Sequence, residues 1–190
     1  MLRIIDAIDN NNSVAVGAIF KEFSDYRDIF TPFAGATWLH YAASQGSDGV
    51  VNYLLNTGIN INIGDRWEQA TAICFAAQEG NESTTKLLIE RGIRLDTDQS
   101  VRNPLFAAIV GRSPECVRLI LEAGIDATAR YNTRTMKNMD AVAFAMMQGE
   151  VECAHIIALW NAGGDEAAAQ AAMRDGDHIA SLNVVKPRKR

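Results

Sequence analysis

Cysteine is scarce in this sequence, which has three among 190 residues: Cys74, Cys116 and Cys153. An odd number does not suit a disulfide framework, and the first residues, MLRIIDAIDNNN, contain no secretory signal pattern. We therefore expect a reducing compartment and a cytoplasmic protein, in which Cys116 and Cys153 are core residues.

Motifs that carry chemistry are also missing. The sequence has no glycine-rich phosphate loop, no C-x-x-C pair and no H-E-x-x-H helix. Cys153 and His155 are two residues apart, a spacing that points them to different faces of a helix, and His178 stands alone. We therefore predict that the chain is not an enzyme and has no metal site and no cofactor.

Long apolar runs and positive charge are limited too. No run approaches the roughly 18 residues that cross a bilayer, so no membrane partner is expected. The formal net charge is −5, and because the last five residues, KPRKR, carry four positive charges, residues 1–185 sum to −9. An acidic body is poorly suited to binding nucleic acid. The tail itself is either a localisation signal or a solvated, mobile end.

What the sequence does contain is a repeat, in which a branched aliphatic residue precedes an alanine by three positions. The five pairs lie at intervals of 35, 34, 32 and 37 residues: Ile4/Ala7, Leu39/Ala42, Ile73/Ala76, Leu105/Ala108 and Val142/Ala145. Apolar or small residues recur nine positions after each alanine (Val16, Val51, Thr85, Val117, Ala154) and twelve positions after it (Ile19, Leu54, Leu88, Ile120, Ile157). Recurrence at this period predicts one structural unit stacked several times.

Each unit divides into two helical stretches. The first is short and rich in small residues, as in LHYAASQG and ICFAAQEG, and the second is longer and amphipathic, as in STTKLLIERG and PECVRLILEAG. Gly58, Gly92 and Gly124 are placed to end the second helices in a left-handed conformation, and Pro114 is placed in a first helical turn. Polar stretches between the units predict turns or hairpin arms.

The repeated stretches resemble the ankyrin repeat. Its T-P-L-H-x-A motif reads TWLHYAA at 37–43, TAICFAA at 71–77, NPLFAAI at 103–109 and DAVAFAM at 140–146. No copy is complete, since Trp38 and Ala72 replace the proline, and Cys74, Phe106 and Ala143 replace the histidine. The resemblance covers residues 1–165. It implies an all-α fold, an ankyrin-repeat solenoid of stacked helix pairs with projecting hairpin loops.

The units predict a single ankyrin-repeat domain over residues 1–185, followed by the basic tail 186–190. Its parts are an N-terminal cap repeat (1–31), four repeats (32–65, 66–97, 98–134 and 135–164) and a C-terminal capping half-repeat (165–185). In the half-repeat, EAAAQAAM is a strong helix former and Gly176 matches the inter-helix glycine. Five extra residues fall within 129–138, where they either serve binding or are a tolerated insertion.

The resemblance also implies which residues do what. His40 would hydrogen-bond neighbouring turns, and the hairpin tips and the residues before the inter-helix glycines would line a concave binding face. Carried over by position, the predicted protein-binding residues are Phe33, Ser44, Gln45, Trp67, Glu68, Gln78, Glu79, Tyr131, Arg134, Lys137 and Gln148. We expect Trp67, Tyr131 and Arg134 to be the anchors, with packing of Trp67 on the adjacent hairpin as the alternative. Val110 and Gly111 indicate either a close approach or neutral variation.

The preferred hypothesis is a module that binds a partner protein stoichiometrically through its concave and hairpin face and is monomeric when free. The architecture is similar to small bacterial ankyrin proteins that act as immunity partners of secreted toxins, and an acidic body would suit a basic toxin or effector. The alternative is a regulatory or scaffold subunit of a larger assembly, directed to the nucleus by KPRKR. An enzyme or metal protein is the third, least favoured hypothesis.

Overall fold

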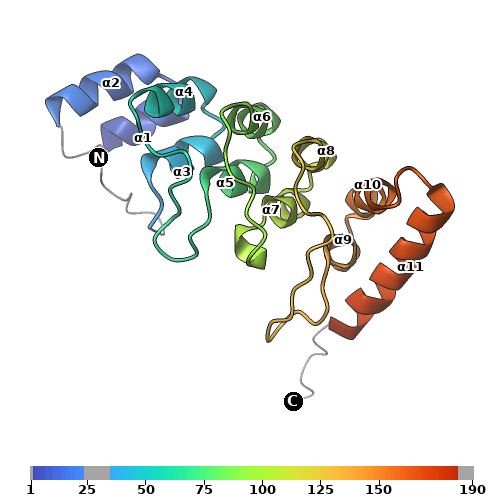
Figure 1. The fold of residues 1–190 in the computed structure, drawn as a ribbon. Coiled ribbons are helices and arrows are strands. Elements are labelled where there is room, and N and C mark those ends of the chain that lie inside the picture. Colours follow the sequence, from blue (N-terminus) through green and yellow to red (C-terminus); the bar gives the residue numbers. More distant parts are fainter. Residues whose placement is uncertain (1, 24–34, 184–190) are drawn as a thin grey trace.

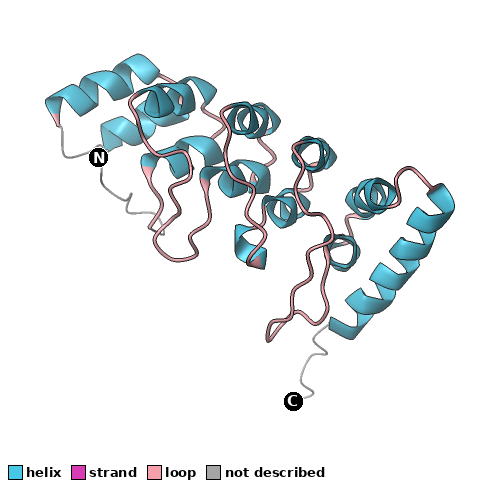
Figure 2. Ribbon diagram, viewed as in Figure 1, coloured by secondary structure: helices cyan, strands magenta, loops and turns pink. Residues whose placement is uncertain are grey.

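The computed structural model of the chain describes residues 2–23 and 35–183. Within them, helices and loops are present and no β-strand is formed (Figure 2). The first helices of the units are α1 (Leu2–Asp9), α3 (Trp38–Ser44), α5 (Ala72–Gln78), α7 (Pro104–Val110) and α9 (Ala141–Gln148). The second helices are α2 (Ser13–Glu22), α4 (Asp48–Asn56), α6 (Glu82–Glu90), α8 (Pro114–Glu122) and α10 (Val151–Asn161). A 3-10 helix, η2 (Ser100–Arg102), precedes α7, and α11 (Glu166–Asn183) follows α10.

The helix pairs stack side by side in chain order, from α1 and α2 in blue to α9 and α10 in orange, and α11 closes the far end (Figure 1). The loops that precede α5, α7 and α9 all project from the same side of the stack (Figure 1). This arrangement confirms the predicted all-α solenoid with projecting loops. None of the helices in residues 2–23 and 35–183 is both long enough and apolar enough to span a bilayer.

The repeated positions of the sequence form the core. All five alanines of the repeat, and the aliphatic residues three positions before them, are at most 5% exposed. The positions nine and twelve residues later are at most 6% exposed. Because alanine is small, adjacent first helices can pack closely, while the larger residues of the second helices fill the space behind them. Cys116 and Cys153 are fully buried with free thiols, as expected.

The ends of α4, α6 and α8 and the start of α8 lie at the glycine and proline residues that the sequence predicted for them. Gly58, Gly92 and Gly124 have φ angles of 88°, 80° and 88°, and each lies two residues after the last residue of α4, α6 or α8. Pro114 begins α8, and its N-terminal turn is capped by Ser113, whose hydroxyl accepts a hydrogen bond from the Cys116 backbone N–H. The lengths of the second helices were therefore predictable from glycine and proline spacing.

His40 joins two neighbouring units. The backbone N–H of Thr37 donates to His40 Nδ1 over 3.0 Å, so the proton is on Nε2, which donates to the Ala70 carbonyl over 3.0 Å. The His40 side chain is fully buried. The role that the resemblance implied for His40, a hydrogen bond to a neighbouring turn, is thus present in the structure.

This burial makes the stability of the chain depend on pH. Desolvation lowers the pKa of His40 below 6.5 and outweighs the opposing hydrogen bond to Ala70. The unfolded chain then binds a proton at a higher pH than the folded chain, so stability falls as the pH drops below about 6.5, by up to about 1.4 kcal/mol per pH unit. Urea unfolding between about pH 7.5 and about pH 5.5 measures this slope. The His40→Gln variant should lack it, and an equal slope in both proteins would contradict the assignment.

The C-terminal helix differs from the sequence prediction. Gly176 was expected between two short helices, and this is wrong: Gly176 is buried in the middle of the continuous helix α11. A Cβ atom there would lie 3.0 Å from Val142 Cγ1 and 3.3 Å from the Ala143 backbone nitrogen of α9. The missing side chain allows α11 to pack closely on α9, which offsets the cost of about 1 kcal/mol for glycine in a helix.

Candidate protein-binding face

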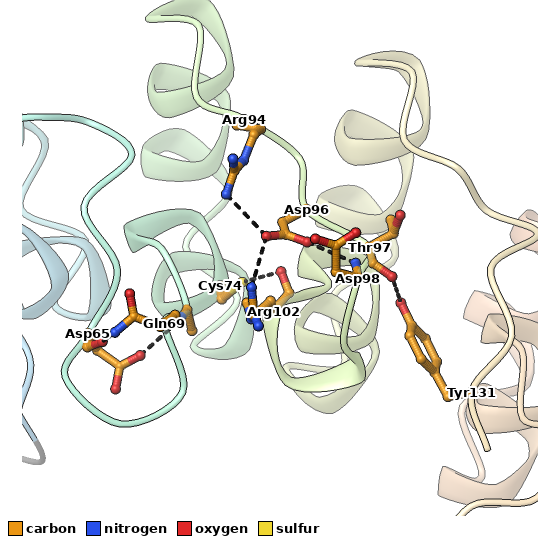
Figure 3. Close-up of polar contacts among 10 residues, drawn as sticks. Asp65, Gln69, Cys74, Arg94, Asp96, Thr97, Asp98, Arg102 and Tyr131 are labelled. Carbon is orange, nitrogen blue, oxygen red and sulfur yellow. Dashed lines mark hydrogen bonds and ion pairs between the residues drawn. The ribbon is translucent and has the colours of Figure 1, made fainter. Parts of the chain in front are cut away.

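The loop before α5 is organised by one buried carboxylate. Asp65 Oδ2 accepts hydrogen bonds from the backbone N–H groups of Trp67 (3.0 Å) and Glu68 (3.2 Å), and Oδ1 accepts from Ala70 (2.8 Å). The Gln69 side chain donates to the Asp65 carbonyl over 2.8 Å, a contact that Figure 3 shows. Asp65 is 3% exposed, so these donors replace the water that its charge would otherwise bind. The turn therefore holds residues 66–69 in one conformation at the edge of the stack.

Trp67 is presented by this turn and is 68% exposed. The Arg66 backbone N–H donates to the Gly35 carbonyl over 3.0 Å, and a Cβ atom on Gly35 would lie 2.8 Å from Trp67 Nε1. One edge of the indole therefore meets the preceding loop, while most of the ring faces solvent. The ring therefore contacts the adjacent loop and keeps most of its surface exposed, and its role in binding a partner stays a prediction.

Replacing Gly35 with alanine should move the indole. Gly35 has φ +70°, so a side chain there is strained as well as too close to Trp67. We expect greater acrylamide quenching of Trp67 in a Trp160→Phe background, where the remaining Trp38 is buried. Gly58→Ala is the matched control, because Gly58 has φ +88° and nothing within 4 Å of the added atom. Equal quenching in the two glycine variants would show that Gly35 does not position Trp67.

The loop before α7 is held by a second buried carboxylate. Asp96 lies 3.2 Å from Arg94 Nη2 and 3.6 Å from Arg102 Nη1, and it accepts the Asp98 backbone N–H over 2.8 Å (Figure 3). The Cys74 thiol of the preceding unit donates to the Arg102 carbonyl over 3.2 Å. These contacts fix η2 and leave Val101 48% exposed beside α5 and α7.

Tyr131 lies in the interior, where it is not available as the exposed anchor that was expected. It is 7% exposed, its hydroxyl donates to the Thr97 carbonyl (2.9 Å) and accepts from Asn103 Nδ2 (2.9 Å), and its ring meets Phe106 edge-on with centroids 5.1 Å apart. Burial raises the pKa of its phenol. Tyr131 thus fastens the extra residues of 129–138 to the preceding unit (Figure 3).

The rest of this insertion reaches toward the same face. Tyr131 and Met139 form an antiparallel bridge, and beyond it Arg134 and Lys137 are exposed while Met136 is half-buried. The Lys137 backbone N–H donates to Asn183 Oδ1 (2.6 Å), and Asn183 Nδ2 donates back to the Lys137 carbonyl (3.1 Å). The last residue of α11 therefore supports the tip of the insertion.

The loops that precede α5, α7 and α9, together with these three helices, line an open groove of about 620 Å³. Its floor comes from α5, α7 and α9, and its edge comes from Trp67, Val101 and Met136. Two of its lining side chains, Asp65 and Glu68, are charged, and both are acidic. The lining residues are Asp65, Trp67, Glu68, Ala70, Cys74, Phe75, Gln78, Ser100, Val101, Phe106, Ala107, Val110, Met136 and Phe144.

Gly111 brings two of these helices together. A Cβ atom on Gly111 would lie 2.2 Å from the Ala77 carbonyl oxygen and 2.8 Å from the Gln78 carbonyl oxygen. The glycine at the end of α7 is therefore required by a close approach of α5, which decides the question that the sequence left open. Its neighbour Val110 is 46% exposed and lines the groove.

The predicted binding residues divide into four sets, of which the first is Tyr131 alone, because it is buried and does not line the groove. Trp67, Glu68 and Gln78 line the groove. Exposed or half-buried positions that do not line it are Ser44, Gln45, Glu79, Arg134, Lys137 and Gln148. Phe33 lies outside the described residues, as does the basic tail 186–190, which was not among the predicted binding residues.

Sequence reasoning missed the apolar floor. Phe75, Phe106 and Phe144 hold equivalent or adjacent positions in three successive first helices, a column that a search for apolar rather than polar positions would have found. Phe106 and Phe144 stack with centroids 4.5 Å apart and planes inclined by 21°. In the described part of the chain, no cluster of three or more histidine, cysteine or acidic residues is arranged to hold a metal ion.

Comparison with known proteins agrees with the resemblance to ankyrin repeats that the sequence showed. Residues 39–131 match the family model described as ankyrin repeats, in three copies. The chain is 33% identical over 122 residues to alpha-latrotoxin-Lg1a of Latrodectus geometricus and 33% identical over 103 residues to inversin of Gallus gallus. These matches cover 63% and 54% of this chain but 9% of each relative. The chain thus spans about a tenth of the length of the curated relatives it matches.

Proposed function

Residues 39–131 are ankyrin repeats, and from this premise we propose that the chain binds a partner protein stoichiometrically through the groove and the loop tips beside it. Ankyrin repeats form protein-protein interaction modules, with recognition carried by a surface that runs across several units. In this chain the groove crosses three successive units and is lined largely by apolar and aromatic side chains.

The observation that carries the proposal is the exposed indole of Trp67 at the edge of this groove. Tryptophan is enriched among the residues that contribute most to binding energy, and an exposed apolar patch with a polar rim is typical of an interaction site. Val101 and Val110 are also about half exposed in the same groove. Burying these three side chains against a partner would remove apolar surface from water.

A capture experiment with matched valine variants tests the proposal. The tagged chain is used to capture proteins from native lysate, and Val110→Gln, which places an amide in the groove, should reduce the captured partner about tenfold. Val151→Gln is the control, because Val151 is 55% exposed but lies on α10, away from the groove. Equal loss in both variants, or full capture by Val110→Gln, would place binding elsewhere.

The finer hypothesis is that the partner is a secreted toxin, for which the chain is the immunity protein. The net charge of −9 over residues 1–185 suits a basic toxin. Co-expression of the chain with the captured partner tests this: rescue of growth by the wild type and not by Val110→Gln is the expected result. Growth that is unaffected by the partner alone would exclude a toxin.

The chain is proposed to be monomeric when free, and the regulatory or scaffold role with nuclear targeting remains the alternative. Deleting residues 186–190 distinguishes the scaffold role from simple partner binding. If KPRKR directs a scaffold subunit to the nucleus, the deletion abolishes nuclear localisation. Unchanged localisation would argue against that role.

A further inference from the structure

We propose that the segment of the partner protein that enters the groove is acidic, with an apolar side chain on the apolar floor and carboxylates beside Arg134 and Lys137. The inference rests on the proposed function, because it names the chemistry of the partner for the same groove. It is carried by the charge of the insertion at 129–138, by the hydrogen bonds that fix this insertion, and by Met136, which belongs both to the insertion and to the groove.

The insertion differs in charge from the rest of the chain. It contains Arg130, Arg134 and Lys137 and no acidic residue, a charge of +3. Since residues 1–185 sum to −9, the part of them outside the insertion sums to −12 (−9 minus 3). Cations on so acidic a chain are expected to pair with its own carboxylates. Arg130 does so, since its Nη2 lies 2.7 Å from Asp140 Oδ2.

Arg134 and Lys137 are different. Both are exposed, and neither side chain forms an ion pair with a carboxylate of residues 2–23 or 35–183. This holds although Asp98 is exposed on the neighbouring loop. The charge of these two side chains is therefore open to an anionic group of another molecule.

Hydrogen bonds hold the insertion in place before any partner binds. The Thr133 backbone N–H donates to the Met136 carbonyl over 2.7 Å, and the Thr133 hydroxyl accepts from the Met136 backbone N–H over 3.0 Å. The paired hydrogen bonds between Asn183 and the Lys137 backbone support the same turn from α11. A prearranged loop has less conformational freedom to lose on binding, so its cations can contribute to affinity.

Met136 connects the two cations to the groove. It lines the groove, as do Phe106 and Phe144, and in sequence it lies between Arg134 and Lys137. An apolar side chain packed at this end of the groove removes aromatic surface from water. A carboxylate on the same segment then meets a guanidinium or ammonium group, which is a charge-assisted contact.

The other end of the groove selects less strongly for charge. Glu68 is exposed there, but the adjacent Arg66 is exposed too and has the opposite charge. The Asp65 carboxylate is buried and accepts three backbone N–H groups. The acidic part of the occupant is therefore expected at the insertion, and its apolar part is expected toward Trp67.

Charge also distinguishes an acidic protein segment from a nucleic acid. A nucleic acid carries a continuous row of phosphates, and binding it requires many cations along its path. The insertion offers two unpaired cations on a chain that is otherwise acidic, which suits a short acidic segment. A partner that is basic overall can carry such a segment, because net charge acts during the approach whereas these two cations act at contact.

Synthetic peptides of defined charge test the proposal. The acidic peptides have two phenylalanines with three aspartates before or after them, and the basic peptides have lysines in place of the aspartates. Fluorescence anisotropy with the full chain at low salt should show the better acidic peptide binding at least about tenfold more tightly than either basic peptide. Val110→Gln should weaken the acidic peptide, because the phenylalanines would lie in the groove.

Charge reversal locates the acidic part of the peptide. The variant Arg134→Glu/Lys137→Glu should bind the acidic peptide about tenfold more weakly than the wild type, and the basic peptides more tightly. Lys21→Glu/Lys86→Glu is the matched control, because both lysines are exposed and lie on second helices, α2 and α6. Circular dichroism and the urea midpoint check that every variant is folded.

Three results would overturn the proposal. The first is equal binding of acidic and basic peptides by the wild type, or no measurable binding of either. The second is a loss of affinity in Arg134→Glu/Lys137→Glu that is no larger than in the control. The third is displacement of the acidic peptide by a lower concentration of oligothymidine than of unlabelled peptide, since the cations would then serve a nucleic acid.

The outcome is separable from that of the proposed function. If Val110→Gln loses the partner captured from lysate while Arg134→Glu/Lys137→Glu retains it, the groove binds a partner and this inference alone fails. If Val110→Gln captures its partner in full, the proposed function fails whatever the two cations do. If both hold, the two variants lose the partner and the lysine control retains it.

Discussion

Replacing Gly111 with alanine is expected to lower the free energy of unfolding by about 2–3 kcal/mol, the range for overpacking a tight contact. The added Cβ atom would lie 2.2 Å from the Ala77 carbonyl oxygen and 2.8 Å from that of Gln78. Both are backbone atoms, which cannot turn away as the end of a side chain can. The helices α5 and α7 must therefore move apart, and the groove that they share must widen.

Urea unfolding of Gly111→Ala and Gly49→Ala measures this effect. Gly49 lies within α4, and a Cβ atom there would meet the Asn11 side chain at 3.0 Å, which can move. Alanine at this position also gains helix propensity, so its net effect should be within about 1 kcal/mol of the wild type. If Gly111→Ala is as stable as Gly49→Ala, the close approach of α5 and α7 is not a constraint on the fold.

Trp67→Ala is expected to weaken partner binding about 30-fold or more, which corresponds to the loss of about 2 kcal/mol at a residue that dominates an interface. Stability should change little, because the ring is 68% exposed in the free chain. Titration calorimetry with the captured partner measures the affinity, and thermal unfolding checks the fold.

Trp160→Ala is the matched control for this variant. Trp160 is 49% exposed but lies in α10, among the second helices. Equal losses in affinity for the two tryptophan variants would contradict the assignment of the groove. Tyr131→Ala is unsuitable as a companion, because it removes a buried ring and two hydrogen bonds and would confuse lost binding with lost structure.

The fold could be predicted because its signals are local and repeated. The aliphatic-alanine pairs mark the buried face of each first helix, and Gly58, Gly92 and Gly124 end the second helices with positive φ angles. Each signal needs only a few neighbouring residues and occurs several times. The resemblance in the loop-to-helix motif adds the direction in which the loops project.

The site was predicted in part, because its missing features depend on contacts between distant residues. Tyr131 stands in a polar stretch and looks exposed, yet its partners Asn103 and Thr97 are 28 and 34 residues away. Gly176 looks like a turn, yet its contact with α9 places it in a helix. For Trp67, whose neighbours in sequence are charged, exposure and packing on the adjacent hairpin were both left open, and its 68% exposure and its contact with Gly35 became known only from the structure.

Hydrogen exchange with and without the captured partner tests the central claim most directly, that this chain binds through one face. The account predicts slower exchange at residues 65–70, 99–102 and 133–138 and in α5 and α7, with α4, α6, α8 and α10 unchanged. Protection confined to the second helices, with the three loops still exchanging freely, would contradict it and move the binding surface to the opposite side of the stack.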